Sequence, residues 1–449
     1  MPDRASTESR NMPDDTYDTV VIGAGTAGTR AARELTDRGL RVVLLEAADR
    51  VGGRTMARPF SGYPGVDVIV DYGGSWINRS IQPFMRREIA RYAIPVKDDQ
   101  PATNAAFFTG GQRRLLPVPT EELGDLERAL HLVRDASKRI MPNQPLSTQP
   151  IRDLDVTPDV FFAGLDLPPA TRDLVLSMIG AYSGASGHNV SMLSIIAQVT
   201  NYGYSPIGFV NALTERFVGG VDGLLRAMIE GSRLEVRLQH KVSHVTQTDD
   251  TVTVRTEGGV TVDARSCVVA VPTNVIRHIE FTPGLSPAKQ AGTATNHLSR
   301  ATKTIMLVSD LHDRPFALGT GSFQMIAHAY DLGDGRHILY GFGGQQVGDL
   351  DPYDRDSVER ALHQYLPHVE VLAVDAYDWN ADPLFDGTYR VDPAGESYDF
   401  LRAMSQPEGA IVFAGTDVDD SGWRTWMEGS FNSAQYAADT IMGILARRH

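Results

Sequence analysis

The glycine-rich stretch at residues 20–55 constrains the fold more than any other part of the sequence; it reads VVIGAGTAGTRAARELTDRGLRVVLLEAADRVGGRT. The apolar residues 20–22 predict a buried strand, the glycine cluster after them a tight turn, and residues 29–38 a helix. A second apolar run at residues 42–45 predicts another strand, which ends at Glu46. A strand, helix and strand with G-x-G-x-x-G at the first corner is typical of a fold that binds a dinucleotide.

The residues of this corner suit a dinucleotide chemically. Gly23, Gly25 and Gly28 would let the backbone approach a pyrophosphate at the helix N-terminus. Glu46 would accept hydrogen bonds from ribose hydroxyls. Three glycines at such offsets would occur by chance about 0.4 times in a chain of this glycine content, so the motif alone also fits an ordinary loop. The flanking strands and the acidic residue favour the dinucleotide.

Two further glycine clusters favour a flavin over a nicotinamide cofactor. The sequence RVGGRT at residues 50–55 supplies a second glycine turn at Gly53 and a cation, Arg54, suited to a diphosphate. The sequence DYGGSW at residues 71–76 would let the backbone approach a flat ring, although it also fits an ordinary corner between a strand and a loop.

Composition bounds the class of protein. A chain of 449 residues is too long for one core, and its 42% hydrophobic and 22% charged residues are typical of a soluble globular protein with two or three lobes. The net charge of -14 and the lack of basic runs argue against nucleic acid and membrane partners. No run of 18 apolar residues occurs, and residues 1–16 are polar, so we expect a disordered leader and a cytoplasmic protein.

The sequence offers little for metal or thiol chemistry. Cys267 is the only cysteine, which excludes an intrachain disulfide and a dithiol pair, and its apolar surroundings, SCVVAVP, indicate a core residue. No His or Cys cluster has the spacing of metal ligands, so we expect no metal. We interpret His188, His297 and His328 as hydrogen-bonded structural residues.

The rest of the chain alternates between helical and strand patterns. Helices are predicted within residues 82–94, 120–140, 170–184, 191–204 and 354–366, and strands within residues 234–272, 302–309, 336–344 and 410–415. A last helix is predicted to begin near Met427. Because a nucleotide fold that begins near residue 17 still receives a strand and a helix at 410–445, we expect its domain to be discontinuous.

Taken together, these motifs resemble the flavin-containing amine oxidase family, which includes monoamine and polyamine oxidases. The resemblance also includes ERFVGGVDGLLRAM, VVAVP and the closing VFAGTDVDDSGWRTWMEGSFNSAQYAA, and it extends from Tyr17 to about Leu445. Within the family, LDLPPATRDLVL, YLPHVEVLAVDAYDWNADPLFDG and IEFTPGLSP are most similar to the bacterial 6-hydroxy-L-nicotine oxidases.

The resemblance implies an α/β fold of two domains, α+β in organisation: a discontinuous Rossmann-like FAD-binding domain and a substrate domain of mixed sheet and helices. The FAD-binding domain is expected at residues 17–82, 208–295 and 391–449, and the substrate-binding domain at residues 83–207 and 296–390.

The resemblance also implies which residues contact FAD: Gly23, Gly25, Gly28, Glu46, Gly53, Arg54, Gly74, Ser75, Trp76, Val242, Thr416, Asp417 and Met427. Val242 would meet adenine through its backbone, and Thr416 and Asp417 would face the ribityl chain, although Asp417 also fits a solvated loop. The amide of Met427 would donate to the pyrimidine carbonyl at a helix N-terminus. Thr388 stands where many monoamine oxidases have a cysteine that tethers the flavin, so we expect non-covalent FAD.

Three residues are implied to be catalytic. Tyr389 and Trp426 match the two aromatic walls that orient a neutral amine beside the flavin, although both also fit a protein core. Lys303, in RATKTIMLV, matches a lysine that reaches flavin N5 through a water and assists reoxidation; the alternative is an edge-strand lysine that reaches solvent.

The expected reaction moves a hydride from the alpha carbon of a small primary, secondary or cyclic amine to flavin N5, giving an imine, and oxygen then becomes hydrogen peroxide. One alternative is a flavin amine dehydrogenase with a protein or quinone acceptor. Another is an L-amino-acid oxidase, for which Arg79 is the candidate carboxylate clamp. Small residues near Ala181 and Ala327, where the nicotine enzymes have larger ones, make hydroxynicotine a doubtful substrate. A homodimer is compatible with the sequence.

Overall fold

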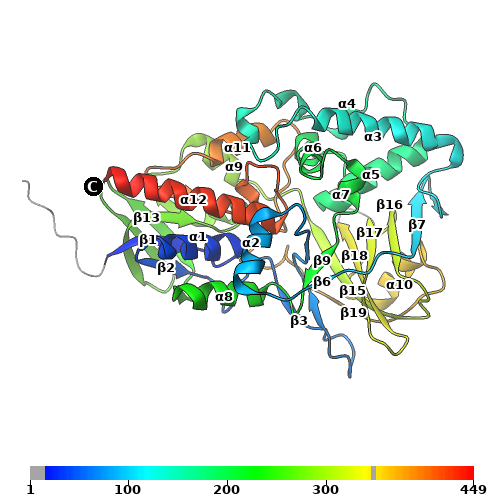
Figure 1. Cartoon of the computed structure of the whole chain (residues 1–449), viewed down its shortest axis with the longest axis horizontal. Coiled ribbons are helices and arrows are strands. Elements are labelled where there is room, and N and C mark those ends of the chain that lie inside the picture. The colour runs from blue at the N-terminus through cyan, green and yellow to red at the C-terminus, as the bar shows by residue number, and fades with distance from the viewer. Residues whose placement is uncertain (1–15, 345–349, 449) are drawn as a thin grey trace, which may run out of the picture.

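The computed structural model describes residues 16–344 and 350–448, and Figure 1 shows their arrangement. The leader expected at residues 1–16 therefore lies, except for Thr16, outside the described residues. Two large sheets and a layer of helices organise the part of the chain that is described (Figure 1).

The first sheet has eight strands among the described residues, in the order β10-β2-β1-β13-β12-β11-β14, and β20 also pairs with β13. They are β1 (Tyr17–Ile22), β2 (Val42–Leu45), β10 (Glu235–Arg237), β11 (Val242–Gln247), β12 (Val252–Thr256), β13 (Thr261–Val269), β14 (Glu280–Thr282) and β20 (Ile411–Phe413). The pairs β10–β2, β2–β1, β1–β13 and β13–β20 are parallel, whereas β11, β12 and β13 form an antiparallel meander. Strands β1 and β2 are buried along almost their whole length, as continuous apolar runs predict.

Helices α1 (Thr26–Asp37), α8 (Asp222–Ser232) and α12 (Met427–Arg447) lie beside this sheet, and α12 runs along α1 (Figure 1). Helix α1 begins earlier than the expected residue 29, because Gly28 fits inside its first turn. A Cβ at Gly28 would collide with the carbonyl oxygen of Gly23, so the missing side chain lets the helix pack on the turn below it.

The second sheet has seven strands in the described chain, in the order β19-β15-β18-β17-β16-β7-β8. They are β7 (Asn104–Thr109), β8 (Gln112–Arg114), β15 (Ala301–Ser309), β16 (Pro315–Gly319), β17 (Met325–Asp331), β18 (His337–Gly344) and β19 (Glu370–Ala376). Successive residues of β15 point to opposite faces of the sheet and pack into two different hydrophobic cores. Met306 and Val308 pack with α10 (Arg355–His363), while Ile305 and Leu307 face the main core.

The other elements connect and cover these sheets. The helices are α2 (Pro83–Tyr92), α3 (Leu123–Ser137), α4 (Pro158–Phe161), α5 (Pro169–Ser183), α6 (Met192–Asn201), α7 (Pro206–Val210), α9 (Pro287–Thr293) and α11 (Ser397–Met404). The 3₁₀ helices are η1 (Thr120–Glu122), η2 (Leu146–Thr148), η3 (Arg152–Leu154), η4 (Thr273–His278) and η5 (Thr416–Val418). Two small sheets pair β3 (Ala57–Pro59) with β4 (Ile69–Asp71), and β9 (Glu215–Phe217) with β5 (Trp76–Ile77) and β6 (Val96–Asp98).

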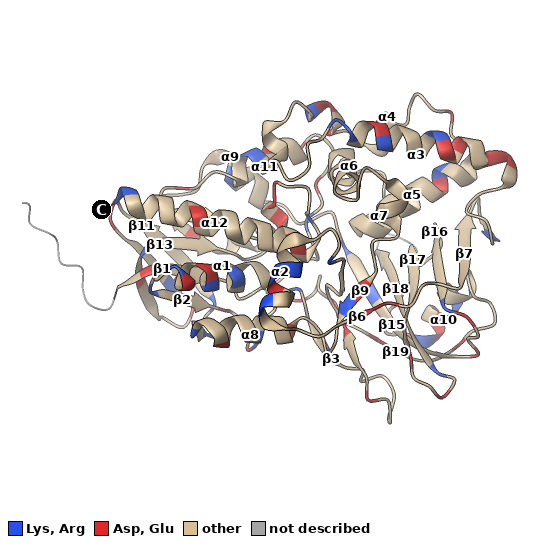
Figure 2. Ribbon diagram, viewed as in Figure 1, with Lys and Arg blue, Asp and Glu red and all other residues tan. Residues whose placement is uncertain are grey.

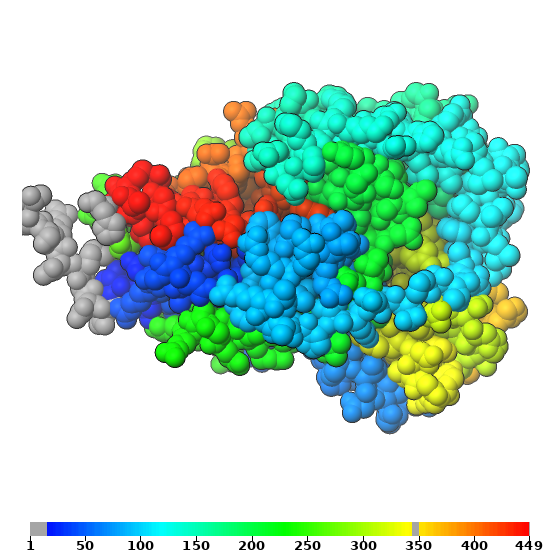
Figure 3. All heavy atoms as spheres, viewed as in Figure 1, coloured from blue at the N-terminus to red at the C-terminus, as the bar shows by residue number. Residues whose placement is uncertain are grey.

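The architecture is the expected α/β fold, in which each large sheet gathers segments far apart in sequence. The domain boundaries stay a prediction. Helix α2, which those boundaries assign to the substrate domain, packs through Met85 and Ile89 against Leu224 of α8 and Phe431 of α12. On the face drawn in Figure 3, the blue segment that contains α2 lies against the red helix α12.

Charged residues of both signs are interspersed on α1, α2 and α3 (Figure 2). Within residues 16–344 and 350–448, no helix is long and apolar enough to cross a membrane. In the same residues, no group of three or more His, Cys, Asp or Glu side chains is arranged to hold a metal ion.

Candidate active site

A cavity of about 630 Å³ draws its lining from both large sheets and from α1, α5 and α12. The glycine corner after β1 and the end of β2 contribute to this lining, and so do Lys303, Tyr389 and Trp426. A cavity of this size is within the range of cofactor and ligand sites.

The glycine corner is built by two turns that touch. Gly23 has a φ of 98°, and a Cβ there would lie 2.9 Å from the carbonyl oxygen of Ala270, so only glycine fits. The amide of Gly52 donates to the carbonyl of Ala24 at 2.9 Å, and a Cβ on Gly53 would lie 3.2 Å from Cα of Gly25. Backbone from both turns therefore faces the cavity at the N-terminus of α1.

Glu46 fixes this corner from the end of β2. Its carboxylate accepts hydrogen bonds from the amides of Ala24 at 2.6 Å and Ala48 at 2.8 Å, and burial raises its pKa. The carbonyl of Glu46 accepts from the amide of His240 at 2.7 Å, which brings the start of β11, with Val242, to the same end of the cavity.

The half-buried Arg54 and the buried Asp417 form an ion pair, with Nη2 of Arg54 2.9 Å from Oδ1 of Asp417. Asp417 also accepts from the amides of Thr273 at 3.1 Å and Arg390 at 3.2 Å. Burial alone would raise the pKa of Asp417, but Arg54 and His297 lower it to about 2. Asp417 is therefore neither a cavity wall nor a solvated loop carboxylate; it holds Arg54, which lines the cavity.

Gly28 and Asp417 are thus the two predicted cofactor residues that do not line the cavity. Gly28 instead packs against Gly23, and Asp417 pairs with Arg54, and both of these neighbours line it. The other predicted cofactor residues line it: Gly23, Gly25, Glu46, Gly53, Arg54, Gly74, Ser75, Trp76, Val242, Thr416 and Met427.

Thr388 also lines the cavity, and its hydroxyl lies 2.6 Å from Oγ of Ser299. Its carbonyl accepts from Nη1 of Arg54 at 2.7 Å. Cys267 lies fully buried within β13 and is not part of the cavity lining. The side chain at the tether position is therefore a hydroxyl, and the chain's thiol lies elsewhere.

The part of the lining that contains Lys303, Tyr389 and Trp426, called the aromatic end below, is mainly aromatic and apolar. Tyr389 is half-buried, and desolvation by its surroundings raises the pKa of its hydroxyl to about 12. Trp426 precedes the first residue of α12 and donates from Nε1 to Oε1 of Gln198 at 2.9 Å. Other side chains that line this end are Ala181, Tyr182, Leu213, Ala301, Met325 and Phe342.

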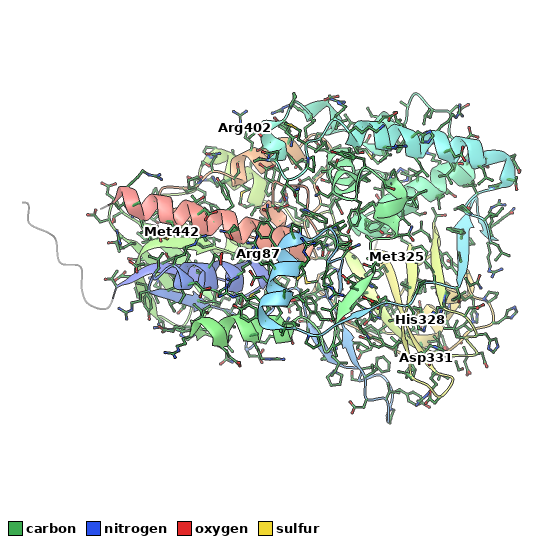
Figure 4. All side chains as sticks on the ribbon, viewed as in Figure 1. Arg87, Met325, His328, Asp331, Arg402 and Met442 are labelled. Atoms are coloured by element: carbon green, nitrogen blue, oxygen red, sulfur yellow. The ribbon has the colours of Figure 1, made fainter. Side chains whose placement is uncertain are left out.

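Strand β17 contributes Met325 to this end, rather than the expected Ala327. Figure 4 shows Met325 toward the middle of the molecule, with His328 and Asp331 farther along the same strand. His328 therefore lies away from the lining, where its Nε2 is 3.2 Å from Nδ1 of His337.

The other singled-out polar residues also have structural partners. His297 bonds to Thr273 at 3.0 Å, and burial lowers its pKa to about 4. His188 lies on the surface near Asp159. Arg79 is paired with Glu215, whose Oε1 is 2.6 Å from Nη2, and it does not line the cavity.

Lys303 is buried at the cavity wall, 6% exposed, and not a lysine that reaches solvent. Its Nζ donates to the carbonyl of Asp71 at 3.0 Å, to the carbonyl of Gly73 at 2.8 Å and to Oγ of Ser75 at 2.5 Å. Burial lowers the pKa of Lys303 to about 7; Asp71 opposes this shift and Arg216 adds to it.

Residues outside the sequence motifs orient Trp76. Its Nε1 donates to Oδ2 of Asp99 at 2.8 Å, and Asp99 is paired with the buried Arg216 at 2.7 Å. Nζ of Lys303 lies 5.1 Å from the Trp76 ring. Asp99, Arg216 and Gln198 carry no local signal in the sequence, because their roles come only from partners far along the chain.

Comparison with known proteins decides the family. A model of the family described as flavin containing amine oxidoreductase matches residues 27–442. The chain belongs to the flavin-containing amine oxidoreductase family. This confirms the resemblance noted from the sequence, and it makes the protein an oxidoreductase with a flavin cofactor.

Relatives of this flavin-containing amine oxidoreductase include two enzymes named for nicotine. The (S)-6-hydroxynicotine oxidase of Paenarthrobacter nicotinovorans is 32% identical over 95% of this chain and 99% of that protein. Nicotine dehydrogenase of Pseudomonas putida is 30% identical over 96% of this chain and 89% of that protein. The solved structure of putrescine oxidase bound to putrescine has a TM-score of 0.85 and 21% identity, over 95% of this chain and 99% of that chain, which shows a shared fold.

The residues present fit the flavin that membership of this family implies. Backbone at Gly25 and Gly53 leaves a cradle that a Cβ would narrow, and the N-termini of α1 and α12, which have no side-chain cap, reach the cavity. Arg54 supplies a cation that the carboxylate of Asp417 holds in place.

Proposed function

We propose that the protein is an FAD-dependent amine oxidase that converts a small primary, secondary or cyclic amine to an imine and reduces oxygen to hydrogen peroxide. The observation that supports this most is the continuity of one cavity from the paired glycine turns to the aromatic end that contains Lys303. One part of the cavity suits a dinucleotide, and the other suits an uncharged amine.

In this proposal FAD binds non-covalently along the lining. Gly23, Gly25 and Gly53 bring backbone to the pyrophosphate, Glu46 accepts from the adenosine ribose, and Val242 meets adenine. Arg54, Thr416, Gly74, Ser75, Trp76 and Met427 contact the remainder. Gly28 and Asp417 act through Gly23 and Arg54. When bound, the flavin would supply a hydride acceptor at N5 and then deliver the electrons to oxygen.

Tyr389 and Trp426 are the proposed walls that orient the amine nitrogen and exclude water. Lys303 holds a proton at Nζ near neutral pH and serves the return of electrons to oxygen. Three protein oxygens hold its Nζ in place, so Lys303 acts from a fixed position.

The lining also supports a substrate class. Among the described lining residues, the only carboxylates are Glu46 and Glu257, and both lie toward the adenine end with β2 and β11. Arg54 is the only arginine of that lining, and Asp417 and Thr388 already engage it. Lys303, the cation at the aromatic end, already donates to three protein oxygens. A second ammonium or a carboxylate on the substrate would therefore lie without a free partner, which favours a monoamine with an apolar body.

Anaerobic mixing of the purified protein with paired amines tests this function. Cyclohexylamine and a cyclic secondary amine such as pyrrolidine represent apolar monoamines, and putrescine and L-leucine are their charged counterparts. We expect loss of the visible absorbance of the oxidised flavin with monoamines alone. Reduction by none of a broad amine panel would contradict the proposal.

The electron acceptor is tested separately, because relatives include both oxidases and dehydrogenases by name. With an amine that reduces the flavin, air should restore the oxidised spectrum and yield one peroxide per amine. Slow reoxidation in air with fast reoxidation by a quinone would favour the dehydrogenase alternative. The L-amino-acid oxidase alternative is weakened because Arg79 is paired with Glu215. The homodimer and the cytoplasmic location stay predictions.

A further inference from the structure

Each aromatic wall of the cavity has an arginine close to it in the chain. Arg390 directly follows Tyr389, and Arg424 stands two residues before Trp426. Both arginines are buried, at 5% and 4% exposure, behind the lining rather than in it. A buried guanidinium needs a partner, so the neighbours of these two groups show what they do.

Asp392 joins the two arginines. Nε of Arg390 lies 2.5 Å from Oδ1 of Asp392, and Nη1 of Arg424 lies 2.6 Å from Oδ2. Asp392 is fully buried, which alone would raise its pKa, yet the two cations hold its pKa well below the usual range. One carboxylate thus ties the segment of Tyr389 to the segment of Trp426.

Further contacts hold the two guanidinium groups in place. Arg390 donates from Nη1 to the carbonyl of Gly292 at 2.9 Å and lies 3.4 Å from the centre of the Phe400 ring. Arg424 donates to Oγ of Ser397 at 3.1 Å and lies 5.6 Å from the same ring. Helix α11 therefore supports both arginines of the triad formed by Arg390, Asp392 and Arg424.

The backbone between Arg424 and Trp426 is constrained. Thr425 has a φ of 71°, a left-handed conformation that a β-branched residue rarely adopts. Such a residue persists only where its surroundings over-determine it. Arg424 holds this segment on one side, and Oγ1 of Thr416 holds it on the other by donating to the carbonyl of Trp426 at 3.0 Å.

Stability alone does not account for the triad. Buried ion pairs often add little to the free energy of folding compared with apolar side chains of similar size. In the described part of the chain, Nε and Nη2 of Arg424 also have no hydrogen-bond partner, which is unfavourable for a buried cation. The contacts that the triad does make are directional and converge on the two wall segments.

We propose that Arg390, Asp392 and Arg424 form a positioning clamp that sets the separation and tilt of the Tyr389 and Trp426 rings, and thereby the pose of the amine. This inference rests on the proposed function, because the pose matters only if an amine lies between the rings. Misplacement of a reacting group by about 1 Å can lower a rate roughly 100-fold, whereas apolar contact with the rings would survive. Loss of the clamp should therefore slow the chemical step more than it weakens amine binding.

The holoenzyme with Arg424→Met is the main test, because this change keeps the neutral Arg390–Asp392 pair and leaves no buried carboxylate unpaired. The matched control is Arg152→Met, at an exposed arginine paired with Asp399 of α11. In anaerobic stopped flow with cyclohexylamine, we expect Arg424→Met to lower the limiting rate of flavin reduction at least about 10-fold and to change the dissociation constant less than about 3-fold. Arg152→Met should change neither constant.

A second measurement does not depend on turnover. The indole N–H resonance of Trp426, assigned with Trp426→Phe, should move in Arg424→Met and stay in place in Arg152→Met. An unchanged resonance together with an unchanged reduction rate would overturn the clamp. So would equal losses of rate and amine affinity, which indicate general damage.

If Arg424→Met does not retain flavin, the same two constants, the limiting rate of flavin reduction and the amine dissociation constant, are measured for Arg424→Lys. This variant keeps the charge but loses the planar fork of the guanidinium. A normal rate in Arg424→Lys would then overturn the proposal, and a lowered rate with normal amine affinity would support it. Reduction of the wild-type flavin by an amine is the separate check on the proposed function. If cyclohexylamine does not reduce the flavin, any amine of the panel that does so takes its place. If no amine reduces it, the position of the Trp426 indole resonance in Arg424→Met tests the clamp.

Discussion

At the scale of single residues, two buried charges dominate the site. Lys303 has an amine held by three protein oxygens, and its lowered pKa, about 7, lets it gain or lose a proton near neutral pH. Asp417 has the opposite character, because its partners keep it ionised well into the acid range. One group is suited to proton exchange, and the other to permanent support.

Lys303→Met should slow reoxidation of the reduced flavin by oxygen about 100-fold, the usual effect of a positioned proton-transfer group, with normal flavin content. Stopped-flow mixing of the amine-reduced protein with oxygenated buffer measures the rate. Lys97→Met is the control, because Lys97 lies 3.9 Å from the Tyr330 ring and outside the lining. Unchanged oxygen kinetics in Lys303→Met would refute the role.

Asp417 should make the protein sensitive to acid. Its folded pKa, about 2, is below the ordinary 3.8, so its stabilisation is present above pH 3.8 and is lost as the pH falls toward 2. Between pH 5 and 2, the wild type should lose about 2 kcal/mol more unfolding free energy than Asp417→Asn. Urea unfolding at a series of pH values measures this. The exposed Asp135→Asn should follow the wild type, and parallel curves for Asp417→Asn would contradict the assignment.

At the scale of elements, the close fit of α1 on the β1 turn decides whether the glycine corner forms. Gly28→Ala should destabilise the protein by about 3 kcal/mol or more and reduce flavin content, because backbone, not a flexible side chain, occupies the space its Cβ would need.

The control for this change is Gly443→Ala in α12, where the new Cβ would meet only Nη1 of Arg447 at 3.6 Å. It should stabilise the protein by about 0.5–1 kcal/mol, because alanine favours a helix. Chemical denaturation and flavin absorbance measure both variants. A Gly28→Ala protein as stable and as yellow as the wild type would show that α1 can shift.

Elements with a strong local pattern were predictable from the sequence. The buried runs of β1 and β2, and the helices α5 and α12, follow from periodicity and from glycine placement. Strand β16 was missed because it is short and is bounded by Pro315 and Gly319, and β17 was missed because His328 and Asp331 interrupt its apolar pattern. The start of α1 was placed too late because Gly28 was assigned to the turn rather than to the helix.

The site divides in the same way. The glycine corner and the aromatic walls carry motifs, so their residues are predictable from the sequence alone. The partners that hold these residues are not predictable, because they are contacts across the fold. Gln198 bonds to Trp426, Asp99 bonds to Trp76, and Asp392 lies between two arginines. The sequence pointed to Ala327 instead of Met325, because register alone does not show which end of β17 reaches the cavity.

At the scale of the whole molecule, the cavity gathers its lining from many parts of the chain. Its lining comes from both large sheets and from α12, so bound FAD would contact segments that lie far apart in the sequence. Ligands that bind only the folded state stabilise it by mass action.

Flavin should therefore be removable, and its return should stabilise the protein. Acid precipitation should release all yellow colour, because Thr388 offers no thiol. Adding FAD to the stripped protein at 100 times its dissociation constant should stabilise it by about 2.7 kcal/mol, seen as a higher melting temperature. FMN, which lacks the adenosine part, is the control. Colour that stays in the precipitate would contradict non-covalent binding.

The pairing of α12 with α1 has a consequence for biosynthesis. The glycine corner emerges early from the ribosome, but Trp426, Met427 and Ser430 of the same cavity belong to a segment made hundreds of residues later. A nascent chain therefore has no complete chamber for the proposed FAD, and FAD should bind only once α12 has left the exit tunnel.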